Sequence, residues 1–336
     1  MGNIRTLRKR VKVETVIYNN EILSSYKNGN TEVIILRDGT KIRRIPIDEK
    51  PVLEFPEMID LKISDRCNHN CPFCYTDSKP DGKYVDFSKI PYYIRSIYSG
   101  TEVAIGGGSI FENPTTELLL EYLKYRNIVA SITVNEKDIR DLECVGKVID
   151  WYSRDLIKGL GISLDPNPLQ DKKTSFNYSR LFSVYKIINN KKYRLKSDIV
   201  FHAIVGVHNP DDLLDISSDF KLLILGFKKD CGRSKEFFES DKYIEYNYNK
   251  IMTHFKVVSF DNLALEQLDI KSKVSEEIWN KYYMGDDGEY SIYIDAVKNY
   301  ASISSSHISN FRYDIKPDDT INEIFKLISK EDNIYD

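Results

Sequence analysis

Long hydrophobic runs are absent from this chain of 336 residues. No stretch approaches the ~20 apolar residues that a bilayer-spanning helix needs. Near the N-terminus, basic residues such as Arg8, Lys9 and Arg10 interrupt any hydrophobic export signal. These two absences predict a cytoplasmic protein with no membrane partner.

Cysteine is also scarce, with five residues in the whole chain. Thiols stay reduced in the cytoplasm, where disulfides are rare. Cys144 and Cys231 stand far from each other and from the remaining three, so we interpret both as buried structural thiols. The other three, Cys67, Cys71 and Cys74, lie within eight residues and require a different explanation.

Charge of one sign is not in large excess, since the formal net charge is -3 and the pI is near 6.1. This balance argues against a general nucleic-acid binder. The first 50 residues are nevertheless basic, with eleven Lys and Arg against six Asp and Glu. We interpret them as a solvated basic edge, and docking of an acidic or phosphate-bearing partner is the alternative.

Short β-rich runs alternate with turns in the first part of the chain. Residues 15–18 and 32–36 are rich in β-branched side chains, and Asp38-Gly39 follows the second run. An Asp-Gly pair between such runs is a strong hairpin signal. We therefore predict that residues 1–56 form a small N-terminal β-hairpin appendage.

From Met58 the pattern changes to apolar runs separated by amphipathic stretches. The predicted strands are residues 59–63, 102–105, 130–134, 159–164, 199–205 and 222–225. The predicted helices lie near residues 113–123, 136–149, 174–188, 210–217 and 234–252. Strand–helix alternation over six units predicts an α/β core, residues 57–260, with parallel strands. Periodicity alone allows either an open doubly wound sheet or a full or partial barrel.

The last part of the chain departs from this alternation. Residues 257–260 are compatible with a seventh strand, and a helix is predicted over 276–284. An alternating hairpin over 290–303 and a final amphipathic helix near 321–328 follow. We predict that residues 261–336 form a C-terminal α+β cap on the core.

The three close cysteines have the spacing C-x3-C-x2-C, and Tyr75 follows them directly. A structural zinc or a fully protein-ligated iron–sulfur cluster usually takes four ligands. Three thiols with no fourth nearby therefore indicate a metal centre with one open coordination position. They follow the first predicted strand, and reactive groups of parallel α/β folds gather at the carboxyl ends of strands.

This motif resembles the signature of the radical S-adenosylmethionine (SAM) enzymes. The resemblance extends over residues 58–260 and implies a partial (β/α)6 barrel. It also implies that Cys67, Cys71 and Cys74 hold a [4Fe-4S] cluster whose fourth iron binds SAM, and that Tyr75 lies near the cofactor. A reductant such as flavodoxin or ferredoxin would supply the electron that cleaves SAM to a 5′-deoxyadenosyl radical, which removes hydrogen from a substrate.

The segment after the second strand supports the resemblance. Gly106, Gly107, Gly108 and Ser109 stand where the family usually has a Gly-Gly-Glu type segment that holds the amino group of SAM. Glycines allow a backbone to approach a ligand closely, although a triple glycine is also a common turn. Ser109 replaces the glutamate that is common in the family, so backbone carbonyls would take over its contact.

Two further strand ends match the family. Ser163 and Asp165 end the fourth strand, where the resemblance implies contacts with the ribose hydroxyls or the methionine carboxylate of SAM; a turn-forming Asp165 is the alternative. Ile204 and Gly206, on the fifth strand, match the segment that packs against adenine. We expect these four residues to contribute to the SAM site.

Substrate contacts are expected from strand ends and from the cap. The candidates are His202, Lys228, Asp261, Asn262 and Gln267. For His202 the alternative is a core histidine, and for the Asp-Asn pair it is a simple turn. The substrate itself, whether a small molecule, a nucleotide or a peptide, is not determined by the sequence.

Two other functions are compatible with the cysteines. A zinc- or cluster-binding structural module would use the same thiols without catalysis, and a fourth protein ligand would favour it. A degenerate family member would bind SAM without cleaving it, as the serine at position 109 allows.

Overall fold

The computed structural model describes residues 22–166, 172–188, 190–236, 249–306 and 312–331. The strand predicted at residues 15–18 lies outside these ranges. Within them, no helix is long and apolar enough to cross a membrane.

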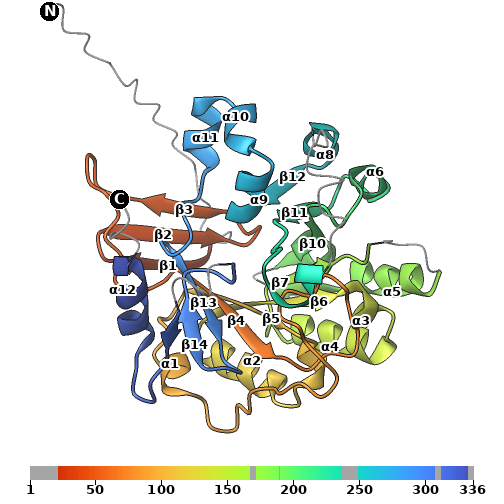
Figure 1. The fold of residues 1–336 in the computed structure, drawn as a ribbon, viewed down its shortest axis with the longest axis horizontal. Coiled ribbons are helices and arrows are strands. Elements are labelled where there is room, and N and C mark those ends of the chain that lie inside the picture. Colours follow the sequence, from red (N-terminus) through yellow and green to blue (C-terminus); the bar gives the residue numbers. More distant parts are fainter. Residues whose placement is uncertain (1–21, 167–171, 189, 237–248, 307–311, 332–336) are drawn as a thin grey trace, which may run out of the picture.

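The N-terminal part forms a separate antiparallel sheet with the order β1-β2-β3. Its strands are β1 (Ile22–Asn28), β2 (Thr31–Leu36) and β3 (Lys41–Arg44). The predicted Asp38-Gly39 turn joins β2 to β3: the Leu36 amide donates to the Thr40 carbonyl at 2.8 Å, and Gly39 has a φ of +93°. The hairpin prediction is confirmed, and Figure 1 shows this sheet beside the main one.

The main sheet has ten strands in the order β12-β11-β10-β7-β6-β5-β4-β13-β14-β15. Every pairing from β4 to β12 is parallel. These seven strands are β4 (Met58–Ser64), β5 (Glu102–Gly107), β6 (Val129–Asn135), β7 (Gly159–Ser163), β10 (Ile199–Ile204), β11 (Lys221–Leu225) and β12 (Val257–Phe260). All predicted core strands are therefore confirmed, and the sheet stays open because β4 and β12 do not pair.

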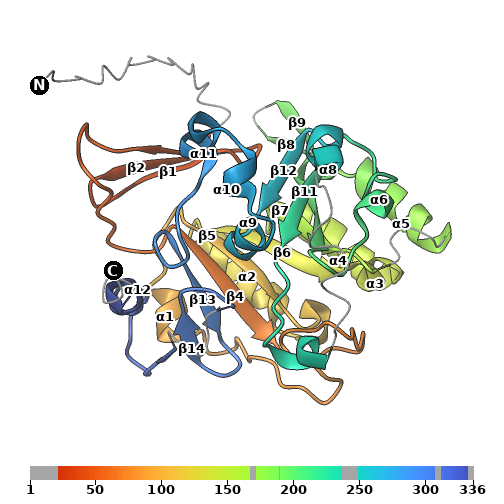
Figure 2. The same cartoon turned by 45° about the horizontal axis from the view of Figure 1, so that its top comes forward.

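Helices cover one face of this sheet, which we call the outer face (Figures 1 and 2). It carries buried aliphatic side chains such as Ile105 and Ile132, and Phe201 packs against Tyr178 with ring centroids 5.8 Å apart. The helices and 3₁₀ turns that follow the parallel strands are η2 (Ile110–Glu112), α2 (Thr116–Tyr125), α3 (Glu136–Ile139), α4 (Leu142–Ser153), α5 (Lys172–Ser183), η3 (Leu195–Asp198), α6 (Pro210–Leu213), η4 (Gly232–Glu236) and α8 (Asn249–His254). This buried layer is the hydrophobic core.

The opposite, inner face is lined by small and polar residues. Strand register places on it Asp60, Lys62, Gly106, Thr133, Gly161, Ser163, His202 and Ile204. A Cβ on Gly161 would lie 2.6 Å from the His202 ring and 3.0 Å from the Thr133 hydroxyl, so strands β6, β7 and β10 are tightly packed there. Most of these residues keep contact with solvent, whereas their outer-face neighbours are buried. A face of this kind is suited to holding a polar ligand.

Helix boundaries differ from the predicted ones in several places. The helix predicted over 210–217 ends at Leu213, and most of the helix predicted over 234–252 lies outside the described residues. The helix predicted from residue 113 starts at Thr116, because the Asn113 side chain accepts the Thr115 amide in a turn. The segment 136–149 contains two helices, since Asp141 caps a new one, α4. Helix α5 ends at Ser183, and a hairpin of β8 (Tyr185–Ile188) and β9 (Lys191–Arg194) follows it.

The C-terminal part continues the main sheet. Strand β13 (Ser291–Asp295) runs parallel to β4, while β14 (Tyr300–Ser302) and β15 (Tyr313–Asp314) continue antiparallel. The predicted hairpin is confirmed. Helices α9 (Asn262–Gln267), α10 (Ile270–Lys273) and α11 (Glu276–Tyr282) precede β13, and α12 (Ile321–Glu331) lies beside α1 (Tyr92–Arg95).

Candidate functional site

The cysteine loop, residues 67–78, extends from the carboxyl end of β4 and is closed at its base. The Asp65 amide donates to the Lys83 carbonyl at 2.7 Å, and the Cys67 amide donates to the Lys79 carbonyl at 2.9 Å. The Lys79 amide returns a bond to the Asp65 carbonyl at 2.9 Å. These backbone bonds hold the loop entrance in a ladder-like arrangement and fix where the loop begins and ends.

All three thiols of the loop are half-buried and outside any disulfide. Burial raises the pKa of the Cys67 thiol, and the neighbouring Cys71 and Cys74 raise it further. Burial also raises the pKa of Cys71, against which the Lys137 and Arg233 charges act. The three sulfur atoms thus share one electrostatic environment. Across the described ranges, no group of three or more His, Cys, Asp and Glu side chains, the loop cysteines included, is placed to hold a metal ion.

A clasp formed by Gly232 and Arg233, in the turn after β11, holds the far side of the loop. The Arg233 guanidinium donates to the Cys71 carbonyl at 3.0 Å, to the Asp77 carboxylate at 2.9 Å and to the Ser78 carbonyl at 3.0 Å. The Arg233 amide donates to the Cys74 carbonyl at 2.9 Å. Gly232 has a φ of +51°, and a Cβ there would lie 2.5 Å from the Cys74 carbonyl oxygen.

The N-terminal turn of α3 holds the near side of the cysteine loop. The His69 Nε2 atom lies 2.8 Å from the Asp138 carboxylate, and Asn135 Nδ2 lies 3.9 Å from the Cys71 sulfur. Ser109, expected at the cofactor, is buried with its hydroxyl 3.5 Å from the same Asp138 carboxylate. The segment after β6 therefore contacts both the cysteine loop and the glycine-rich segment that follows β5.

The three glycines after β5 differ in what surrounds them. A Cβ on Gly107, whose φ is +124°, would lie 2.6 Å from the Ser64 carbonyl oxygen, and one on Gly108 would lie 2.4 Å from the Arg66 carbonyl oxygen. These two glycines allow the chain after β5 to pack against the start of the cysteine loop. A Cβ on Gly106 would meet only Thr133, at 3.9 Å, so space remains above it.

The carboxyl end of β7 brings two predicted residues near the loop after β6. Ser163 lies on the inner face, in register with Asn135 and His202. The Asp165 amide donates to the Glu136 carboxylate at 2.9 Å, and the Asp165 carboxylate lies 3.8 Å from both Lys137 and Arg140. Asp165 is thus held among cations.

Strand β10 ends in a turn stabilised by His208, which sequence reasoning did not single out. Its Nδ1 accepts the Ile204 amide at 2.9 Å, so Nε2 carries the proton and donates to the Leu164 carbonyl at 3.1 Å. Gly206, with a φ of +77°, allows the backbone to form this turn. Phe73 of the cysteine loop meets the His208 ring at 6.5 Å, edge to face.

Tyr75 and Lys228, predicted for different roles, lie together. The Lys228 ammonium stands 3.9 Å from the Tyr75 ring centroid and also donates to the Ser305 hydroxyl. Desolvation raises the pKa of Asp60, an inner-face residue absent from the sequence-based candidates, and the Lys228 charge opposes this rise. The sequence alone does not indicate that a single aspartate in a strand lies near a lysine far away in the chain.

The three candidate residues after β12 form hydrogen bonds with other groups of the chain. The Asp261 carboxylate caps α9 at the Ala264 amide and accepts the Gly226 amide, both at 2.8 Å. The Gln267 amide pairs with both backbone groups of Phe227 at 2.8 Å. Asn262 donates to Asp287 at 2.8 Å.

Asp60 and His202 have opposite pKa shifts. Desolvation by the surrounding protein raises the pKa of Asp60 from 3.8 to about 6, although the residue is exposed to solvent. Burial lowers the pKa of His202 from 6.5 to about 4. Both shifts follow from an environment that disfavours charge.

We expect Asp60→Asn to stabilise the protein above pH 6. The native carboxyl binds a proton more tightly than the unfolded one, so its contribution to stability is present below pH 3.8 and is lost as the pH rises to about 6. The His202 contribution changes in the opposite sense, rising between pH 4 and 6.5. We expect urea unfolding between pH 4 and 7.5 to show that the stability of Asp60→Asn rises more steeply with pH than that of the wild type. The exposed Asp81→Asn should match the wild type. If the stability of Asp60→Asn and of Asp81→Asn changed with pH in the same way, the raised pKa of Asp60 would be contradicted.

Similarity to known proteins lies in the fold and not in the sequence. The sequence matches no known protein family and no curated protein. The structure is similar to that of SuiB from Streptococcus suis bound to the precursor peptide SuiA, with a TM-score of 0.55 and 10% identity over 91% of this chain and 87% of SuiB. SuiB bound to S-adenosylmethionine is also similar, with a TM-score of 0.50 and 11% identity over the same shares of both chains. The expected α/β fold with a largely parallel sheet is confirmed, and it is the fold of SuiB.

Proposed function

We propose that this chain, which has the fold of SuiB, is a radical SAM enzyme acting on a peptide. The observation that carries the proposal is the cysteine loop at the carboxyl end of β4, closed at its base and held on both sides by strand-end segments. Catalytic groups of parallel α/β folds gather at this edge.

The donor set fits a cluster better than a structural zinc. Three half-buried thiols share one environment, with Lys137 and Arg233 offsetting the charge that bound thiolates would carry. A structural zinc takes four ligands, and His69 is already engaged by Asp138. Cys67, Cys71 and Cys74 would hold a [4Fe-4S] cluster, leaving one iron for SAM. When bound, the two groups would supply reductive cleavage of SAM and a 5′-deoxyadenosyl radical that takes hydrogen from the substrate.

The SAM-binding residues proposed from the sequence surround the same edge of the sheet. Gly106 has open space above it, and Ser163 and Ile204 belong to the solvent-contacting inner face. Tyr75, Gly107, Gly108, Ser109, Asp165 and Gly206 would shape the site through the packing described above. His202 and Asp60, which lie on the inner face, would face the substrate.

The peptide substrate is supported by two facts. SuiB binds a precursor peptide, and the main sheet here is open, because β12 does not pair with β4. An open sheet admits a longer substrate to its inner face than a closed barrel would. A flavodoxin or ferredoxin would deliver the electron.

Anaerobic reconstitution with iron and sulfide tests the proposal. The protein should become brown and, once reduced with dithionite, convert SAM to 5′-deoxyadenosine and methionine. SAM binding without cleavage would favour the degenerate alternative. Retention of zinc in air without SAM binding would favour the structural module.

We expect Arg233→Lys to make the reconstituted cluster less stable in air. Lysine cannot reproduce the three guanidinium contacts of Arg233 with the loop, and lost charge-assisted bonds weaken loop order by about 1.5–3 kcal/mol. The absorbance near 400 nm should bleach about tenfold faster than in the wild type. Arg154→Lys, which changes a surface network on α4, is the control. Equal bleaching of all three proteins would show that the clasp does not position the loop.

A further inference from the structure

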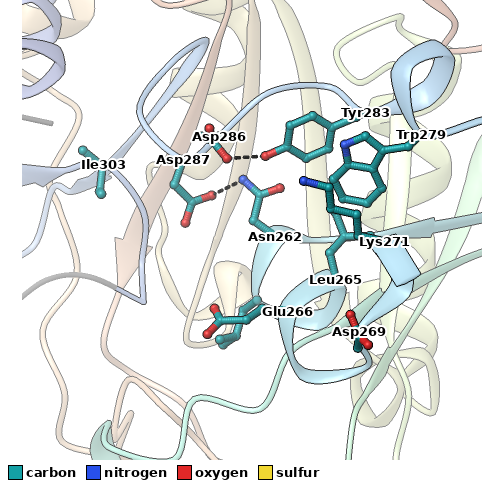
Figure 3. A pocket seen from close by; sticks show the side chains of 11 residues that line it. Asn262, Leu265, Glu266, Asp269, Lys271, Trp279, Tyr283, Asp286, Asp287 and Ile303 are labelled. Carbon is teal, nitrogen blue, oxygen red and sulfur yellow. Dashed lines mark hydrogen bonds between the residues drawn. The ribbon is translucent and has the colours of Figure 1, made fainter. Parts of the chain in front are cut away.

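A pocket of about 500 Å³ lies among α9, α10, α11 and the loop that precedes β13 (Figure 3). It is separate from the cysteine loop. Its lining combines two aromatic side chains, Trp279 and Tyr283, with carboxylates from the α9–α10 segment and from the loop before β13.

The pocket is strongly acidic. Glu266, Asp269, Asp286 and Asp287 line it, and Lys271 is the one cation in the lining, so four negative charges and one positive charge give a formal -3. This equals the formal charge of the entire chain of 336 residues. Glu266, Asp269 and Asp286 form no ion pair with any described residue. Unbalanced charge of this kind attracts a cation.

The aromatic wall is arranged to receive a cation. The Trp279 and Tyr283 rings are stacked with centroids 4.5 Å apart, and the Tyr283 hydroxyl donates to the Asp286 carboxylate, which fixes the ring. The chain's own Lys271 ammonium stands 5.5 Å from the Trp279 centroid. The ring face therefore already attracts an ammonium group, although a weak one at this distance.

The pocket also lies close to the inner face of the sheet. Asn262 donates to Asp287 at 2.8 Å, and in the view of Figure 3 the Asp287 and Glu266 carboxylates lie on the side of Asn262 toward Ile303. The Asp287 charge contributes to the electrostatic environment of Asp60 on β4. A ligand anchored in the pocket would therefore have its remaining part near the inner face.

We propose that this pocket binds a cationic side chain, the guanidinium of an arginine or the ammonium of a lysine, of the peptide substrate. The carboxylates of Glu266 and Asp287 pair with the cation, and Trp279 and Tyr283 form the wall on the opposite side of the pocket. The identification of the ligand as part of a substrate rests on the proposed function, whereas the pocket's preference for cations does not.

Titration of the full-length reconstituted protein with short capped peptides tests the proposal. The probe is acetyl-Gly-Arg-Gly-amide, and the matched neutral peptide contains Gln in place of Arg. Fluorescence of Trp279 is the signal, because the other tryptophan, Trp151, is buried with 3% exposure. We expect saturable binding of the Arg peptide that weakens with salt, and about threefold or more weaker binding of the Gln peptide.

Variants that are expected to change peptide binding in opposite directions make the test more specific. Glu266→Gln and Asp287→Asn should each weaken binding of the Arg peptide about threefold, and Lys271→Met should strengthen it because a competing cation leaves. Glu277→Gln, the same charge change on the exposed part of α11, should have no effect. Equal binding of the Arg and Gln peptides, or equal effects of Glu266→Gln and Glu277→Gln, would overturn the proposal. Because binding requires no SAM cleavage, a protein inactive on SAM could still pass this test, and an active one could fail it.

Discussion

Cys71→Ala should yield a protein that folds but holds no iron–sulfur cluster and cleaves no SAM. Cys71 is the central ligand of the proposed site, flanked by Asn135 and held through its carbonyl by Arg233. Two thiolates on one loop cannot retain a cluster that needs three, so iron content and 5′-deoxyadenosine formation should fall at least about 100-fold. Absorbance near 400 nm, iron analysis and chromatography of the products measure these effects.

Cys144→Ala is the matched control for this loss. Cys144 is a half-buried thiol on α4, and burial raises its pKa, as befits an unreactive group. The control protein should keep the wild-type iron content and SAM cleavage. If Cys71→Ala also retained its cluster, the assignment of the three ligands would be wrong.

Gly107→Ala should destabilise the fold by about 3 kcal/mol. Gly107 has a φ of +124°, which L side chains rarely adopt, and the added methyl group would lie 2.6 Å from the Ser64 carbonyl oxygen. Relief of this overlap would separate β5 from the start of the cysteine loop. Urea unfolding measures the loss, and reconstitution at low temperature should give less cluster per protein.

Gly146→Ala provides a control with the opposite expected sign. Gly146 lies inside α4, and an added Cβ there would have nothing within 4 Å. Alanine in a helix interior should stabilise the protein by about 0.5–1 kcal/mol relative to glycine. Destabilisation by both substitutions would indicate that glycine replacement is harmful in general and that the position of Gly107 is not special.

The six parallel strands β4, β5, β6, β7, β10 and β11 were predictable because the side chains on their outer face are buried. Runs such as residues 159–164 are nearly continuous in small and apolar residues, and turns bound them on both sides. Helix ends were less predictable, because Asn113 and Asp141 act through their side chains on local backbone groups. The sequence alone does not show whether a capping residue starts a helix or only a turn.

The three cysteines stand out in the sequence as candidate ligands because of their spacing, whereas the residues that hold their loop do not. Arg233, His208 and Asp60 gain their roles from contacts with residues far away in the chain, and no local pattern marks such partners. Gly232 is a partial hint, because glycine is typical of positions where the backbone comes close to another group. Asp261 and Gln267, in contrast, were noticed for their position, and their side chains support the loop after β11.

The clasp on the cysteine loop has a consequence for the order of assembly in the cell. Arg233 follows Cys71 by 162 residues, so a growing chain presents its thiols long before the group that fixes them is synthesised. A ribosome-bound chain ending before residue 232 would carry all three cysteines without the clasp. Maturation factors that deliver iron and sulfide would therefore encounter an ordered acceptor only after the β11 unit and Arg233 have been made and folded, so the proposed cluster would be loaded late.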